Sequence, residues 1–68
     1  MIISVNGQPR EVTPPVHLLD LLDLAPGETT PRGIAVALDG TVVPRTQHAT
    51  TEIRDGARVE IVTAVQGG

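Results

Sequence analysis

The sequence of residues 55–68, DGARVEIVTAVQGG, decides the fold. It opens with Asp55-Gly56, a turn dipeptide whose residue types tolerate positive φ. Arg58–Val65 follows and has the longest and most regular strand pattern in the chain. We therefore expect a domain over residues 1–65 that ends in a strand, with Gln66–Gly68 continuing from it as a flexible tail.

A hairpin is predicted at the N-terminus. Met1–Val5 is rich in apolar residues and ends in Asn6-Gly7, the strongest short-range hairpin signal. Gln8–Val12 is then the returning strand. Its Pro9 has no N–H to donate to a neighbouring strand, which places this strand at an edge of the sheet.

A second hairpin is predicted in the middle of the chain. Gly33–Leu38 contains the apolar run IAVAL and leads into the turn dipeptide Asp39-Gly40. Thr41–Val43 returns until Pro44 interrupts the strand. A short bridging strand over Thr51–Ile53 is also expected.

One helix is predicted between the hairpins. Thr13 and the two prolines after it can start a helix over Val16–Leu24, with a loop over Ala25–Arg32. A single helix cannot bury its apolar side alone, so it is expected to pack on one face of a mixed four- to five-stranded sheet. The fold class is therefore α+β, with the β-grasp arrangement found in ubiquitin-like proteins.

The composition excludes several functions. The 68 residues include no Cys, Phe, Trp or Tyr, and the net charge is −3. Thiol chemistry and disulfides are therefore absent, and recognition of nucleic acid by base stacking or a cationic surface is not expected. The N-terminus lacks the pattern of a signal peptide, and no run of residues is long enough to span a membrane. We expect a cytoplasmic protein with no nucleic-acid or membrane partner.

The side chains do not indicate that the protein is an enzyme. The two imidazoles, His17 and His48, have no nucleophile or metal-ligand motif around them, and solvated or capping roles are expected for both. A chain of this length is also too small to build a deep cleft around its carboxylates. No metal and no bound cofactor are predicted.

The C-terminal residues offer a different chemistry. Gly67 and Gly68 have no Cβ, so with Val65 and Gln66 they could thread through a narrow channel into the active site of another protein. Adenylation by ATP would activate the carboxylate of Gly68, and a sulfur nucleophile could then replace AMP to leave a thiocarboxylate. The alternative is a frayed terminus without a role.

Three segments give the chain a family resemblance. MIISVNG at the N-terminus, GIAVALDGTVVPR at Gly33–Arg45 and DGARVEIVTAVQGG at Asp55–Gly68 resemble the sulfur carriers of thiamine biosynthesis, the ThiS family. The resemblance covers essentially the whole chain. Its specific parts are the L-D-G-x-V-V-P-R hairpin and the V-E-I-V-x-A-V-x-G-G ending. Members commonly have Asn where Asp39 stands, an aromatic residue near His48, and Asp where Ala57 stands.

The resemblance implies partners as well as chemistry. An E1-like adenylating enzyme would use ATP to activate Gly68, and a sulfur-delivery enzyme such as a cysteine desulfurase would supply the sulfur. The thiocarboxylate would then donate sulfur to thiazole synthase, so the protein is a co-substrate and not itself an enzyme. The alternatives are the small subunit of molybdopterin synthase or another sulfur-transfer carrier, a protein-conjugating modifier, and a non-catalytic β-grasp interaction module.

Strand alternation also predicts a docking face. If Val59 and Ile61 point toward the helix, Val62 points to the opposite side of the sheet. Applied to every strand, this rule gathers five small or apolar residues on the outer face near the root of the tail: Ile2, Ala35, Ala37, Val62 and Ala64. An apolar patch on a face that is normally polar is a candidate partner surface, and scattered surface hydrophobes without a role are the alternative.

Overall fold

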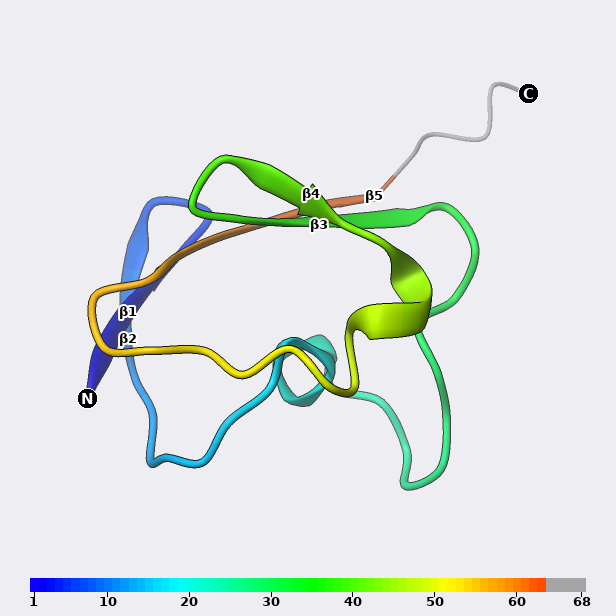
Figure 1. The fold of residues 1–68 in the computed structure, drawn as a ribbon, viewed down its shortest axis with the longest axis horizontal. Coiled ribbons are helices and arrows are strands. Elements are labelled where there is room, and N and C mark those ends of the chain that lie inside the picture. Colours follow the sequence, from blue (N-terminus) through cyan, green and yellow to red (C-terminus); the bar gives the residue numbers. More distant parts are fainter. Residues whose placement is uncertain (64–68) are drawn as a thin grey trace.

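The computed structural model describes residues 1–63 as a five-stranded mixed sheet over a layer of short helical turns and loops (Figure 1). The strand order is β2-β1-β5-β3-β4. The strands are β1 (Ile2–Val5), β2 (Gln8–Glu11), β3 (Ile34–Leu38), β4 (Thr41–Val43) and β5 (Arg58–Thr63). This is the predicted order of hairpin, helical turn, hairpin and final strand.

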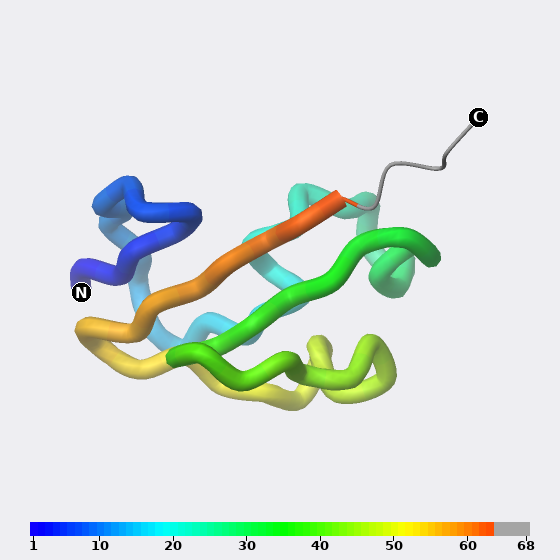
Figure 2. Tube along the Cα trace, turned by 90° about the horizontal axis from the view of Figure 1, so that it is seen from above, coloured from blue at the N-terminus to red at the C-terminus, as the bar shows by residue number. Residues whose placement is uncertain are grey.

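The last strand occupies the middle of the sheet. β5 pairs in parallel with β1 and antiparallel with β3, and Figure 2 shows it running between them. Every other strand is therefore positioned directly or indirectly by β5. The edge strands are β2 and β4, and β2 contains Pro9 as predicted.

The helix is shorter than predicted and of a different type. The segment Val16–Leu24 contains a 3-10 helix, η1, over Leu18–Leu22. In a 3-10 helix, residues three apart lie on the same side, which explains why Leu18 and Leu21 are the buried leucines. Asp23 has the left-handed φ of 55° and ends the helix. A second short 3-10 helix, η2 (Arg45–Gln47), follows β4.

The segment around η1 is also held by backbone hydrogen bonds to a distant part of the chain. The Leu18 N–H donates to the Thr51 carbonyl, and the Ile53 N–H donates to the Val16 carbonyl at 2.8 Å. These contacts form an isolated antiparallel bridge between His17 and Glu52. The bridging segment predicted at Thr51–Ile53 is confirmed.

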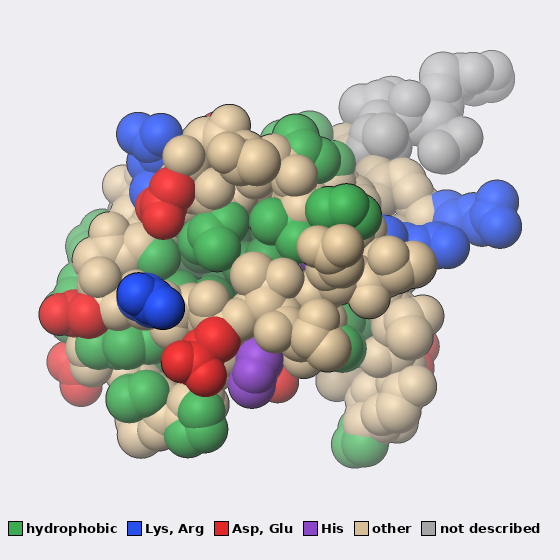
Figure 3. Space-filling view, viewed as in Figure 1, with side chains coloured by type: hydrophobic (Ala, Val, Ile, Leu, Met, Phe, Trp, Pro, Cys, Tyr) green, Lys and Arg blue, Asp and Glu red, His purple; other side chains and the backbone are tan. Residues whose placement is uncertain are grey.

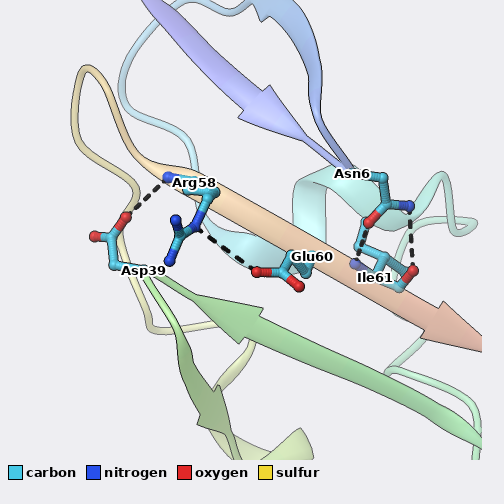
Figure 4. A network of polar contacts seen from close by, with 5 residues as sticks. All are labelled: Asn6, Asp39, Arg58, Glu60 and Ile61. Atoms are coloured by element: carbon cyan, nitrogen blue, oxygen red, sulfur yellow. Dashed lines mark hydrogen bonds and ion pairs between the residues drawn. The ribbon is translucent and has the colours of Figure 1, made fainter.

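The turn dipeptides form the predicted hairpins and also bind to the sheet. Asn6 and Asp39 both have a φ of 51°, and each is followed by a glycine of positive φ. The Asn6 side chain accepts from the Ile61 N–H at 2.7 Å and donates to the Ile61 carbonyl at 3.1 Å (Figure 4). The Asp39 carboxylate accepts from the Arg58 N–H at 2.8 Å. Both turns are therefore fastened to β5.

The core lies between the sheet and the helical layer and is entirely aliphatic apart from two polar residues. The buried apolar side chains are Ile3, Val16, Leu18, Leu21, Val36, Ile53, Ala57 and Val59. Thr30 and His48 are the buried polar residues, each about 1% exposed. The expectation of a solvated or capping His48 is wrong. Its ring is buried, and the ring nitrogens are satisfied by the Thr30 hydroxyl and by the Val43 carbonyl.

Candidate functional site: the outer face of the sheet beside the end of β5

The outer face of β5 is divided into a polar half and an apolar half. Val59 is fully buried beneath the sheet, so Arg58, Glu60 and Val62 alternate onto the other side. Arg58 and Glu60 form an exposed ion pair with an Nε–Oε1 distance of 3.7 Å (Figure 4). Val62 lies beyond that pair, toward the end of the strand, and its side chain is 59% exposed.

Small apolar residues of β3 and β4 continue the surface from Val62. Ala35 pairs directly with Val62 across the β3–β5 ladder, and Ala37 pairs with Val42 across the β3–β4 ladder. Paired residues share a face of the sheet, so these four side chains form one patch. We call Ala35, Ala37, Val42 and Val62 the outer patch.

Val42 belongs to the outer patch although the sequence analysis missed it. Its side chain is 68% exposed, the largest value among the exposed large hydrophobic residues. The signal was present in the sequence, because the two-residue turn Asp39-Gly40 makes Leu38 face Thr41 and hence Ala37 face Val42. Val42 could therefore have been assigned to the docking face, because it is an apolar residue opposite the outward-facing Ala37.

Ile2 does not belong to the same patch. It is 49% exposed on the outer face, but Ser4 pairs with Arg58, and the Gly56 N–H donates to the Ile2 carbonyl at 2.9 Å. Gly56 precedes Val62 by six residues, about 20 Å along an extended strand. The expectation that Ile2 lies close to the root of the tail is therefore wrong, because parallel pairing of β1 with β5 places the start of β1 at the opposite end of the sheet.

The remaining predicted site residues belong to the C-terminal segment. They lie outside the described residues and are Ala64, Val65, Gln66, Gly67 and Gly68. His17 stands at the start of η1, where its backbone N–H donates to the Asp20 carboxylate at 2.8 Å. Its position agrees with the capping role expected for it.

Within residues 1–63, no group of three or more His, Cys, Asp or Glu side chains is arranged to hold a metal ion. Over the same range, none of the helices has the length and apolar character to cross a membrane. On the face drawn in Figure 3, the Arg side chains stand at separate places and form no cationic patch. The outer patch contains two of the three exposed large hydrophobic residues within residues 1–63, Val42 and Val62, on a sheet face that is normally polar.

The sheet order, the helical turn on one face and the final central strand define a small β-grasp protein. The chain belongs to the ThiS family, whose model matches residues 3–68. The fold and the family are therefore those predicted from the sequence.

Solved structures and other sequences show similar proteins. The crystal structure of the thiamine biosynthesis protein ThiS from Geobacter metallireducens superposes with a TM-score of 0.74 at 29% identity, covering 100% of both chains. A solution structure of a thiamine biosynthesis protein from the same organism gives a TM-score of 0.71 at 30% identity, over 100% of this chain and 88% of that one. The uncharacterized protein ycf40 of Porphyra purpurea is 33% identical over 97% of this chain and 90% of its own length.

Proposed function

We propose that this protein is a sulfur carrier of thiamine biosynthesis that works through the carboxylate of Gly68. The observation that carries the proposal is membership of the ThiS family over residues 3–68, a range that includes the Gly-Gly ending. The fold adds support, because the strand that leads toward this ending is the central one, held on both sides by its neighbours. A tail over residues 66–68 would thus continue from a well-anchored element.

The proposed chemistry begins with activation by an E1-like adenylating enzyme. A carboxylate oxygen of Gly68 attacks the α-phosphorus of ATP, and pyrophosphate leaves. The product is an acyl adenylate, a mixed anhydride with AMP as a good leaving group. ATP is a substrate of the partner in this scheme and is not held by the carrier.

Sulfur enters in the second step. A sulfur-delivery enzyme, such as a cysteine desulfurase, holds the sulfur as a persulfide. A thiol reductant supplies the two electrons that release it as hydrosulfide, which attacks the activated carbonyl carbon. The carbon–sulfur bond forms, the carbon–oxygen bond to AMP breaks, and AMP takes the electron pair. The resulting thiocarboxylate is a nucleophile that would donate its sulfur to thiazole synthase. The carrier acts in each step as a protein co-substrate.

The outer patch is the proposed docking surface for the activating enzyme. It lies at the end of β5 nearest the reactive tail, so a partner that covers it would also receive the tail. Val62 and Val42 are exposed and lie beside the small residues Ala35 and Ala37, so the outer patch presents four apolar side chains on one face of the sheet. Burial of these apolar side chains by a partner would contribute to affinity through the apolar area removed from water.

The proposed function is tested by reconstitution of thiazole formation. The full chain and a variant that lacks Gly68 are each combined with the activating enzyme, ATP, a sulfur source, thiazole synthase and the other thiazole precursors. We expect product only with the full chain, while both proteins show the same circular dichroism spectrum. Thiazole formation by the shortened variant would show that Gly68 does not carry the reactive atom.

A further inference from the structure

A small hollow lies on the side of the molecule away from the outer patch, between the two short helices and the loop before β3. Its volume is about 150 Å³, and it is lined by Leu19, Thr29, Thr30, Arg45, Thr46 and Ala49. Arg45 is the last residue of the V-V-P-R segment of the hairpin motif. The Asp39-Gly40 turn does not account for the presence of an arginine at this position. Nothing in the proposed sulfur chemistry uses this hollow.

The lining carries a positive charge without a compensating carboxylate. None of the six lining residues is acidic, whereas two other hollows are each lined by three acidic residues. Neither of the ion pairs formed within residues 1–63 involves Arg45. Its guanidinium therefore has N–H donors available for a ligand in a protein whose net charge is −3.

His48 contacts the three segments that line the hollow, which are η1, the loop before β3 and the start of η2. The His48 carbonyl accepts from the Leu19 N–H of η1 at 3.0 Å. The His48 ring lies 2.6 Å from the Thr30 hydroxyl through Nδ1. Nε2 lies 2.9 Å from the Val43 carbonyl, two residues before Arg45. Because a carbonyl only accepts, Nε2 carries the proton, and in the neutral ring the Thr30 hydroxyl donates to Nδ1. The buried histidine thus fixes the loop, η1 and the start of η2 relative to one another.

We propose that this hollow binds a carboxylate carried on a short aliphatic chain. The guanidinium would pair with the carboxylate in the two-pronged geometry that arginine favours, with the hydroxyls of Thr29 and Thr46 beside it. Leu19 and Ala49 provide apolar surface for the methylene groups. Inorganic phosphate has no methylene group to place against Leu19 and Ala49, so a carboxylate on an aliphatic chain fits this lining better. The ligand is either a free carboxylic acid or an acidic side chain of a partner protein.

The test uses the isolated full-length protein, labelled with ¹⁵N, and sodium propionate at constant ionic strength. We expect saturable shifts of the amide signals of Thr29, Thr46 and Ala49. Propionamide, which has the same shape and no charge, should produce no such shifts, and phosphate should bind more weakly. Equal responses to propionate and propionamide, or no saturable response to propionate, would overturn the proposal.

Two arginine variants locate the site. Arg45→Gln should weaken propionate binding about tenfold, the loss expected from one charge-assisted contact. Arg54→Gln, a matched change in a hollow lined by acidic residues, should leave binding unchanged. Unchanged propionate binding in Arg45→Gln would contradict the proposal.

The source of the carboxylate follows from one more comparison. If propionate competes with the activating enzyme and Arg45→Gln weakens that association, the bound group is an acidic side chain of the enzyme. If the association is unaffected while propionate still binds, the ligand is a free acid. Propionate binding is measured without ATP or sulfur, so this proposal can fail or succeed independently of the sulfur-carrier function.

Discussion

The Asn6 side chain forms two hydrogen bonds with the backbone of Ile61, one from the Ile61 N–H at 2.7 Å and one to the Ile61 carbonyl at 3.1 Å. The Asn6 backbone N–H also donates to the Val59 carbonyl at 2.8 Å, and the side-chain amide extends the contact between β1 and β5 to Ile61. The first hairpin is therefore fastened to the middle of the sheet through a turn side chain. Asn6 adopts the positive φ that the turn requires, and its side chain also stabilises the contact between segments that are 55 residues apart.

Loss of this contact should destabilise the fold. Asn6→Ala removes both hydrogen bonds and places alanine at a φ of 51°, so we expect a loss of about 1–3 kcal/mol in the free energy of unfolding. Asn6→Gly removes the hydrogen bonds but relieves the backbone strain, and it should lose less. Urea denaturation of both variants measures the two contributions. Unfolding free energies equal to that of the parent would contradict the role given to this side chain.

The second hairpin turn depends on the absence of a side chain at Gly40. This residue has a φ of 88°, where a β-branched side chain is strained, whereas the nearest atom to an added Cβ lies at an ordinary 3.4 Å. Gly40→Val should therefore cost about 1–2 kcal/mol through the backbone rather than through a collision. Gly40→Asn should cost less, because asparagine tolerates the left-handed region. A melting temperature of Gly40→Val equal to that of the parent would show that the turn is not tight in solution.

The buried histidine should be essential for stability. His48→Ala leaves a cavity and deprives the Thr30 hydroxyl and the Val43 carbonyl of their partner, so we expect a loss of about 2–5 kcal/mol. Thr30→Val removes one hydrogen bond and keeps the volume, and a smaller loss of about 1–2 kcal/mol is expected. Thermal unfolding followed by circular dichroism compares the two. A His48→Ala protein as stable as the parent would mean that His48 is exposed in solution.

The outer patch can be tested by a charged substitution that leaves the core intact. Val62→Asp should fold normally, because the exposed position keeps the carboxylate hydrated. Its association with the activating enzyme should weaken by up to about 2 kcal/mol if Val62 is a central contact. Ile2→Asn, on the same face but at the far end of the sheet, is the control and should bind like the parent. Titration of the enzyme with each variant provides the measurement.

Two outcomes of the Val62→Asp experiment would contradict the account in different ways. An unfolded variant would show that Val62 is a core residue and that the strand register is shifted by one. A folded variant that binds like the parent would show that the docking surface lies elsewhere.

Local turn chemistry made most of the sheet predictable. The dipeptides Asn6-Gly7 and Asp39-Gly40 define two-residue hairpins, and a two-residue turn determines which residues face each other along both strands. The alternation of Val59, Ile61 and Val62 then separated the core face from the outer face. These features depend on neighbours in sequence, which is why the pattern alone was sufficient.

Features that depend on distant contacts were not predictable in the same way. The burial of His48 arises from Thr30 and from the carbonyl of Val43, neither of which marks a histidine as buried when read in sequence. The separation of Ile2 from Val62 follows from the offset between β1 and β5, which no turn determines. The backbone contacts of η1 to residues 48 and 51 likewise join segments that are distant in sequence.

The central claim, that Gly68 becomes a thiocarboxylate, is tested most directly by the intact mass of the protein. The full chain and a variant without Gly68 are incubated with ATP, the cognate activating enzyme and a sulfur source, then weighed by mass spectrometry. We predict that the full chain gains the mass difference between one sulfur and one oxygen atom and that the shortened variant gains none. An unchanged mass of the full chain, or the same gain in the variant without Gly68, would contradict the account.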